Sequence, residues 1–189
     1  RVVTTLPQTT QPLINFNTHE GDYLITCETD VGIGVLTADC LPLVFYAPEK
    51  AVIAVAHAGW RGSVAGIGPI VVDRLVQEFG VDVGQLKVWF GPAGKVCCYE
   101  VQSDFVAALE GANKNATAPL LEERDGKTFF NNTALNMQQL LATGVDEKNI
   151  DLTNNLCTIC NHAYHSYRRA EDKTLYKTQA TIAWSTGQR

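Results

Sequence analysis

Four short apolar segments between residues 22 and 56 constrain the fold more than any other part of the chain. Each is rich in Val, Ile or Leu and is bounded by turn-forming residues, which is typical of buried β-strands. The segments are 22–27, 32–37, 41–46 and 51–56. Pro48, Glu49 and Lys50 favour a turn between the last two segments, so the sequence predicts that these strands form a hairpin.

Helical periodicity follows these segments. Apolar residues recur at helical spacing from Ser63 to Phe79, Gly80 supplies a stop, and the expected inward face consists of Ile67, Ile70, Val71, Leu75 and Val76. Further helices are predicted at 102–109 and 133–142, with Gly111 and Gly144 just past their ends, and further strands at 86–90 and 181–184. The polar segment 111–127 predicts a surface loop. Strands mixed with helices predict an α/β or α+β fold.

Length and charge limit the classes of protein to consider. The 189 residues suit a single domain spanning 1–189, and hydrophobic residues make up 46%, enough for a sizeable core. The net charge of −5 provides no basic stripe for nucleic acid and no attraction to an anionic membrane. No apolar run approaches the ~20 residues that span a bilayer. We therefore expect neither nucleic acid nor a membrane as a partner.

Six cysteines stand at positions 27, 40, 97, 98, 157 and 160. A disulfide scaffold is normally shorter and denser in cysteine, so we expect reduced thiols and a cytoplasmic protein. The adjacent Cys97 and Cys98 are expected to pack rather than to do chemistry. Cys157 and Cys160 form a CxxC pair that His162 and His165 can complete as a Cys2His2 zinc site, although the His-x-x-His spacing is tight. A second metal site there stays open.

Chemistry-bearing residues stand at the ends of the predicted hairpin strands. Cys40, beside Asp39, precedes strand 41–46, and His57 follows strand 51–56, seventeen residues after Cys40. In a hairpin both positions lie at the same end, so we expect the two side chains to converge on one cleft. Each residue alone is typical of a buried core side chain, but the pairing favours a reactive centre.

A Cys/His pair can serve in three ways. It can act as a thiolate nucleophile with an imidazole base. With a second histidine it can bind zinc and leave one position for water. It can also bind copper in a trigonal site, usually with a weak axial methionine. Met137 is the only methionine and lies in a predicted helix remote in sequence, which favours zinc over copper.

Two groups of arginines are candidates for anion binding. Arg61 stands in a glycine-bracketed turn before a predicted helix, where unpaired backbone N–H groups and a guanidinium suit phosphate. Arg168 and Arg169 form a second basic cluster beside Tyr167. The alternatives are an ordinary surface ion pair for Arg61 and a solvated loop end for the second cluster.

Four motifs carry a family resemblance. TADCLPLVF, AHAGWRGSVAGI, GPA…CCYEV and CT…HSYRR follow one another between about Gly21 and Trp184. In order and spacing they closely resemble the YfiH-like multicopper polyphenol oxidase family, also called the laccase-domain family. The resemblance implies a layered α/β/β/α fold with mixed sheets, similar to the catalytic domain of cytotoxic necrotizing factor. It also implies a zinc-dependent enzyme acting on purine nucleosides, by phosphorolysis of adenosine, inosine, guanosine or methylthioadenosine and by deamination of adenosine. Purine nucleosides and phosphate are then the small-molecule partners.

The resemblance assigns a metal site residue by residue. Cys40 corresponds to the family's metal-binding cysteine and His57 to its second metal-binding histidine. The first histidine belongs to a QVHG motif that precedes a valine-rich strand, here Arg1-Val2-Val3. We therefore expect an N-terminal segment with the third ligand upstream of Arg1. His19 lies in a predicted loop and is not expected to replace that histidine.

Departures from the family pattern concern the substrate more than the fold. Gly94-Lys95-Val96 replaces the family's Ile-Gly-Pro, and 176–180 lacks its arginine, although Lys177 offers a point charge. We expect Arg61, with Arg168 and Arg169, to bind phosphate and Asp39 to move a proton. Three alternatives stay open: a copper-dependent polyphenol oxidase (laccase), a metal-free hydrolase with Cys40 as nucleophile and His57 as base, and an inactive binding protein.

Overall fold

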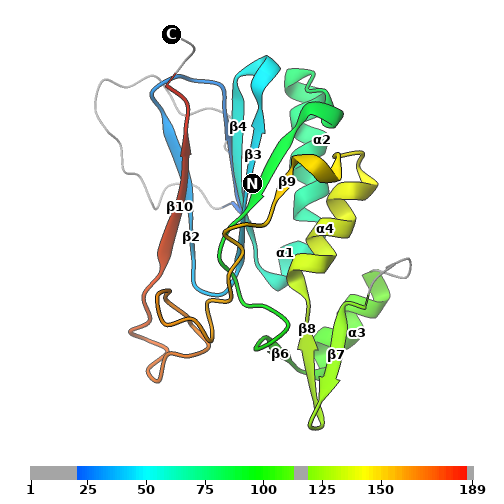
Figure 1. Ribbon diagram of the computed structural model, residues 1–189, viewed down its shortest axis with the longest axis vertical. Coiled ribbons are helices and arrows are strands. Elements are labelled where there is room, and N and C mark those ends of the chain that lie inside the picture. The colour runs from blue at the N-terminus through cyan, green and yellow to red at the C-terminus, as the bar shows by residue number, and fades with distance from the viewer. Residues whose placement is uncertain (1–20, 113–118, 187–189) are drawn as a thin grey trace.

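The computed structural model describes residues 21–112 and 119–186. The strand expected at Arg1–Val3 and His19 both lie outside these residues. Within them the chain forms three β-sheets and four α-helices, the mixed α/β arrangement that the sequence predicts (Figure 1).

A five-stranded sheet forms the centre of the molecule, with the strand order β1-β4-β3-β5-β9. Its strands are β1 (Tyr23–Thr26), β3 (Leu41–Ala47), β4 (Val52–Ala58), β5 (Lys87–Phe90) and β9 (Ile150–Asp151). β3 and β4 pair antiparallel with Leu41 opposite Ala58, so the predicted hairpin is confirmed. β5 and β9 pair in parallel, which makes the sheet mixed.

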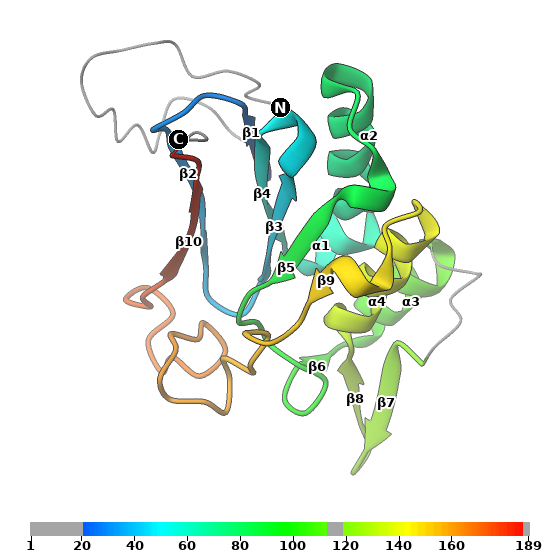
Figure 2. The ribbon, with the colours of Figure 1, turned by 45° about the horizontal axis from the view of Figure 1, so that its top comes forward.

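The two faces of this sheet bury different partners because side chains alternate along each strand. Leu43 and Phe45 face the helices, whereas Ile53 and Val55 face a second sheet. That sheet pairs β2 (Gly32–Thr37) with β10 (Gln179–Trp184) and packs through Ile33. Figure 2 shows the helices on one side of the central sheet and β2–β10 on the other. No helix in the described part of the chain covers the outer face of β2–β10.

The helix predicted from Ser63 to Phe79 is two helices. α1 (Trp60–Val64) and α2 (Ile67–Phe79) are separated at Gly66, whose φ of 78° is left-handed and suits glycine. Gly80 ends α2 as predicted: its φ is 64°, and its N–H bonds the last carbonyls of the helix.

The inward face of α2 differs in part from the prediction. Ile70 and Val76 are exposed, and Gly68 and Val72 are buried instead. The reason is the contact with α4 (Asn132–Ala142). A Cβ on Gly68 would lie 3.3 Å from Cδ2 of Leu140, so the missing side chain lets the two helices approach and sets the rotation of α2.

The predicted loop at 111–127 is wrong in its second half. β7 (Leu121–Arg124) and β8 (Lys127–Phe130) form a hairpin, joined by Asp125 and Gly126 with φ of 52° and 72°. This Asp-Gly turn is a strong hairpin signal, but β7 is mostly charged and carries no apolar alternation. β6 (Glu100–Val101) completes the three-stranded sheet. α3 (Ser103–Ala112) includes Gly111, so its predicted end is also wrong.

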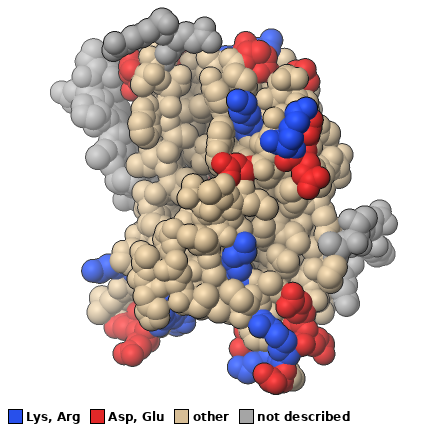
Figure 3. All heavy atoms as spheres, viewed as in Figure 1, with Lys and Arg blue, Asp and Glu red and all other residues tan. Residues whose placement is uncertain are grey.

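Charged groups of both signs are interspersed on the face shown in Figure 3. Near the β7–β8 hairpin, Lys127 pairs with Glu100 at 2.9 Å, and on α2 Arg74 pairs with Glu78 at 3.3 Å. Among the residues described, no helix is both long and apolar enough to cross a membrane.

Candidate active site

The hairpin brings the side chains of Cys40 and His57 to one point. His57 is in β4 opposite Pro42 of β3, and Cys40 immediately precedes β3. A Cβ on Gly59 would lie 3.2 Å from Cys40 Sγ, 3.3 Å from His57 Cε1 and 3.7 Å from His57 Nε2. Because glycine has no Cβ, the space between the thiol and the imidazole stays open.

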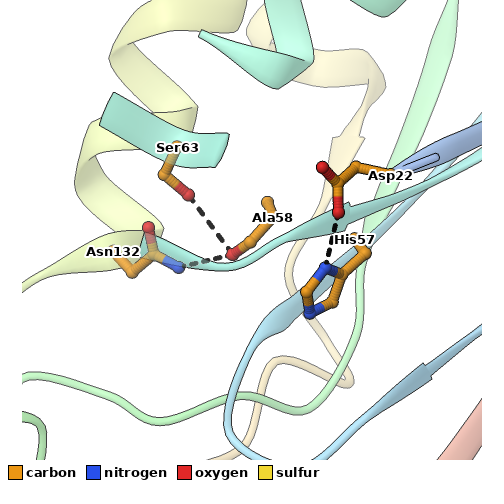
Figure 4. A network of polar contacts seen from close by, with 5 residues as sticks. All are labelled: Asp22, His57, Ala58, Ser63 and Asn132. Atoms are coloured by element: carbon orange, nitrogen blue, oxygen red, sulfur yellow. Dashed lines mark hydrogen bonds and ion pairs between the residues drawn. The ribbon is translucent and has the colours of Figure 1, made fainter. Parts of the chain in front are cut away.

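Asp22 holds the imidazole of His57 from the opposite side. The two side chains are 3.1 Å apart, between Asp22 Oδ1 and His57 Nδ1 (Figure 4). The carboxylate favours the tautomer with the proton on Nδ1, which leaves Nε2 as an acceptor directed toward Gly59. Sequence reasoning missed Asp22, which it placed inside the predicted strand 22–27, whereas β1 begins at Tyr23.

A buried polar network fixes the chain just after His57. Ser63 Oγ and Asn132 Nδ2 both donate to the carbonyl of Ala58, at 3.2 and 3.0 Å (Figure 4). Asn136 Nδ2 donates in turn to Ser63 Oγ and to Asn132. Ser63, Asn132 and Asn136 are almost fully buried, so these hydrogen bonds anchor α1 and α4 to the end of β4 that carries His57.

Asp39, predicted to move a proton, lies at the centre of a buried clamp. Its carboxylate accepts hydrogen bonds from Thr158 Oγ1 at 2.7 Å, Ser166 Oγ at 2.9 Å and the Arg168 N–H at 2.7 Å. Its carbonyl accepts from the N–H of Gly94 at 2.8 Å. Asp39 thereby joins the Cys40 turn to the two segments that carry the later sequence motifs. A role in proton transfer stays a prediction.

Electrostatics at Cys40 disfavour a bare thiolate. Burial, together with the negative charges of Asp39 and Asp22, raises the pKa of the Cys40 thiol to about 11, and the positive charge of Arg168 only partly opposes this rise. Arg168 stacks on the ring of Tyr99, with its guanidinium carbon 4.4 Å from the ring centroid, and donates to the carbonyl of Glu100. A cation bound by the sulfur would offset this unfavourable environment.

The three arginines predicted to bind phosphate differ in what they contact. Arg169 donates to the carbonyls of Thr158 at 2.7 Å and Ile159 at 2.8 Å and bonds that of Tyr164, so its guanidinium closes the loop that precedes it. Arg168 is directed to Tyr99, as described above. Arg61 is exposed and lies over the ring of Trp60 at 4.2 Å, and no carboxylate among the described residues pairs with it.

Four of the other five cysteines form a group that the sequence did not predict. Sγ atoms of Cys97, Cys98, Cys157 and Cys160 all lie within 4.8 Å of one another. The predicted packing role of Cys97 and Cys98 is wrong, since Cys97 is exposed and neither residue belongs to a hydrophobic cluster. The suggested Cys2His2 set is wrong too, because His162 and His165 are not part of the group. All six cysteines are free.

Hydrogen bonding changes the acidity of one thiol in this group. Burial acts to raise the pKa of Cys157, but hydrogen bonds from the backbone of Cys160, Lys95 and Ile159 outweigh it and lower the pKa to about 7. Desolvation of its sulfur and a hydrogen bond with Cys157 raise the pKa of Cys97 to about 11, although the residue as a whole is exposed. Within residues 21–112 and 119–186, the cysteine group is the only set of three or more His, Cys, Asp or Glu side chains whose ligand atoms lie close enough together to hold a metal ion. Cys40 and His57 therefore gain no third ligand from those residues.

Comparison with known proteins identifies relatives along most of the chain. The model of the multi-copper polyphenol oxidoreductase laccase family matches residues 1–185. A protein named purine nucleoside phosphorylase from Aquifex aeolicus is 37% identical over 163 residues, which are 86% of this chain and 71% of that protein. One of the same name from Borreliella burgdorferi is 34% identical, over 86% of this chain and 69% of that protein. A protein named adenosine deaminase RL5, from an unknown prokaryotic organism, is 34% identical, over 78% and 56%.

Solved structures agree in fold. YlmD from Geobacillus stearothermophilus superimposes with a TM-score of 0.78 at 31% identity, covering 87% of this chain and 61% of YlmD. YfiH from Bacillus licheniformis gives 0.76 at 25% identity, with the same coverage. The chain thus spans about three fifths of each of these two structures. From the family match over nearly the whole sequence, we conclude that the chain belongs to the multi-copper polyphenol oxidoreductase laccase family.

Proposed function

We propose that the protein is a zinc-dependent purine nucleoside enzyme, which cleaves adenosine, inosine, guanosine or methylthioadenosine with phosphate and deaminates adenosine. The observation that carries the proposal is the approach of Cys40 and His57 across Gly59, with Asp22 on the far nitrogen of the imidazole. Relatives named purine nucleoside phosphorylase and adenosine deaminase support the same activities.

The donor atoms fit a zinc ion. One thiolate and one imidazole nitrogen are common zinc ligands, and the open space at Gly59 is where a bound ion would contact both. A carboxylate on the second imidazole nitrogen is the usual partner of a metal-binding histidine. The third ligand is expected from a histidine before Arg1. When bound, zinc supplies a Lewis acid and lowers the pKa of a coordinated water to about 7.

The chain's own residues have separate roles in this proposal. Asp22 orients the imidazole by accepting from Nδ1. The exposed guanidinium of Arg61 binds phosphate, which needs a cation not already neutralised by a carboxylate. Asp39 holds the Cys40 turn against the segment 158–168 through hydrogen bonds, and it is also our candidate for moving a proton.

A copper-dependent polyphenol oxidase is the second candidate, and the description of the family favours it. A multicopper cluster needs several histidines, and the described residues place no second histidine in a metal-holding group with Cys40 and His57. A metal-free hydrolase would need Cys40 as a thiolate, and its buried, acidic surroundings oppose that charge. An inactive binding protein would show none of these activities.

The test uses the full-length protein. Inosine is incubated with and without phosphate, and adenosine without phosphate, and the products are separated by chromatography. We expect hypoxanthine and ribose 1-phosphate only when phosphate is present, inosine from adenosine, and bound zinc by elemental analysis. Oxidation of a phenolic substrate with bound copper, or no turnover of any nucleoside, would overturn the proposal.

Two histidine variants make the assignment specific. His57→Gln removes the imidazole beside Cys40, and His162→Gln removes an exposed imidazole outside the site. We expect His57→Gln to abolish nucleoside turnover and His162→Gln to leave it near the wild-type level. Equal loss in both variants would contradict the site assignment.

A further inference from the structure

Four cysteines from two distant parts of the sequence meet on one side of the molecule. Cys97 and Cys98 lie in the segment between β5 and β6, and Cys157 and Cys160 lie in the segment that follows β9. Figure 2 shows these two segments side by side, one green and one orange. An isolated parallel bridge between Ala93 and Cys157 joins their backbones.

The sulfur atoms are arranged as four corners rather than as two bonded pairs. All four Sγ atoms lie within 4.8 Å of one another, and none is in a disulfide. Around a zinc ion with Zn–S bonds of about 2.3 Å, the sulfur–sulfur edge of a tetrahedron is about 3.8 Å. Across the two segments, Cys97 contacts Cys157 and Cys98 contacts Cys160. A small contraction would therefore give the tetrahedral arrangement.

The backbone around Cys157 is already arranged to stabilise a thiolate. Backbone N–H groups of Ile159, Cys160 and Lys95 donate to its sulfur. Two of these donors belong to the CxxC turn itself, and the third comes from the opposite segment. Donors that surround a ligand atom fix its position and its charge before a metal arrives. This is a second observation, independent of the distances between the sulfurs.

Access and chemistry also suit a metal ion. Cys97 and Cys160 are exposed, so an ion can enter from solvent, while Cys157 is buried and fixed. Four sulfur ligands with no nitrogen or oxygen select zinc among the abundant divalent ions, and a set of four protein ligands leaves no position for a substrate. The site would therefore be structural.

We propose that Cys97, Cys98, Cys157 and Cys160 bind one zinc ion, in a structural site separate from Cys40 and His57. On binding, each thiol releases its proton and each sulfur donates an electron pair to the metal, with no change in oxidation state. The ion joins the segment before Tyr99 to the segment before Arg168. The Arg168 guanidinium stacks on the ring of Tyr99, and both residues lie near Cys40. By joining the two segments, the zinc therefore fixes Tyr99 and Arg168 beside the active site.

The first measurement is the metal content of full-length protein purified under reducing conditions, together with the X-ray absorption spectrum of the bound zinc. The Cys40→Ser variant is used because it removes the sulfur of the other site. We expect about one zinc per chain in this variant, with a first shell of sulfur only. A shell of nitrogen and oxygen, or no retained metal, would overturn the proposal.

Cobalt replacement and ligand variants locate the ion. Cobalt(II) bound by four thiolates gives intense sulfur-to-metal charge-transfer absorption, which Cys160→Ser and Cys97→Ser should strongly weaken. Both residues are exposed, so these variants are expected to fold even if the buried Cys157→Ser does not. The matched control is Cys27→Ser, which removes another exposed cysteine outside the group and should leave the spectrum unchanged.

Thiol reactivity separates zinc from the main competitor, a pair of disulfides. With zinc bound, the four cysteines should resist alkylation and become reactive after a chelator is added, while Cys27 reacts in both states. Protection that a chelator does not remove, but a reductant does, would show disulfides and overturn the proposal. Rapid alkylation of all four without a chelator would overturn it as well.

Discussion

Asp22 and His57 are joined twice, once by backbone and once by side chains. The N–H of His57 donates to the carbonyl of Asp22 at 2.7 Å, and His57 Nδ1 lies 3.1 Å from Asp22 Oδ1. The pairing of β1 with β4, which sets Tyr23 opposite Ala56, continues to these two residues. Strand register therefore helps to set the orientation of the imidazole, together with the side-chain contact at the surface.

The first prediction concerns Asp22→Asn. Asparagine keeps the shape of the side chain but loses the negative charge that favours a proton on His57 Nδ1. When zinc is added back after chelation, we expect the concentration that gives half-maximal nucleoside cleavage to be roughly 10- to 100-fold higher than in the wild type. Loss of a residue that hydrogen-bonds a metal ligand typically weakens metal affinity by about this factor. The control is Asp73→Asn on the exposed side of α2. An unchanged zinc requirement would show that the contact is incidental.

Gly59→Ala tests the open space between the thiol and the imidazole. The φ and ψ of Gly59 are −64° and 164°, which alanine adopts freely, so the new methyl group changes space and not backbone conformation. It would lie 3.2 Å from Cys40 Sγ and 3.3 Å from the His57 ring. We expect at least about a tenfold loss of activity, as misplacement of reacting groups commonly produces, with little change in melting temperature.

Its matched control is Gly111→Ala in α3, where an added Cβ meets nothing within 4 Å. That variant should keep full activity and gain up to about 1 kcal/mol from helix propensity. Full activity in Gly59→Ala would mean that the space between Cys40 and His57 is not used.

The hairpin and the pairing of Cys40 with His57 could be predicted because both depend on local sequence. The turn signal at residues 48–50 makes β3 and β4 neighbours in the sheet, and the alternation of buried and exposed side chains sets the register of their pairing. Asp22 could not be placed in the same way. Its contact with His57 depends on which strand β1 joins, and a short apolar strand carries no information about its partner.

The four-cysteine group was missed for a related reason. Cys97 and Cys157 are sixty positions apart, in irregular segments whose path follows from backbone bonds such as Ala93 N–H to the Leu156 carbonyl. No periodicity describes such segments. The rotation of α2 was missed because it depends on Leu140 packing against Gly68, a contact between helices far apart in the sequence.

Asp39→Asn tests whether Asp39 stabilises the fold or transfers a proton. Asparagine tolerates the left-handed φ of 85° at this position, so the backbone turn is preserved. Its amide cannot accept from Thr158, Ser166 and the Arg168 N–H together, and we expect a loss of about 1.5–3 kcal/mol in the free energy of unfolding. Urea unfolding measures this loss. A large fall in kcat with unchanged stability would instead assign Asp39 to the chemistry.

The last prediction compares Arg61 and Arg169, for both of which the sequence analysis predicts phosphate binding. Arg169 contacts the carbonyls of Thr158, Ile159 and Tyr164. The exposed Arg61 lies over the ring of Trp60, and its guanidinium forms no hydrogen bond or ion pair with the described residues. Arg169→Ala should lower the free energy of unfolding by about 2–4 kcal/mol, since several carbonyls lose a charged donor. Arg169→Lys should not restore it, because an ammonium cannot reach the carbonyls that the planar guanidinium spans.

Arg61→Ala should act on phosphate instead. A charge-assisted hydrogen bond to phosphate contributes about 1.5–3 kcal/mol, which corresponds to roughly a 10- to 100-fold weaker phosphate affinity when it is lost. An exposed structural ion pair would contribute only ~0–1 kcal/mol, and its loss would appear in the melting temperature. The measurement is the phosphate dependence of inosine cleavage beside thermal unfolding, both in full-length protein, with Arg74→Ala on α2 as the control.

A lowered melting temperature with unchanged phosphate dependence would make Arg61 part of the scaffold. We would then assign phosphate binding to Arg168, whose backbone N–H donates to Asp39 and whose positive charge acts on Cys40.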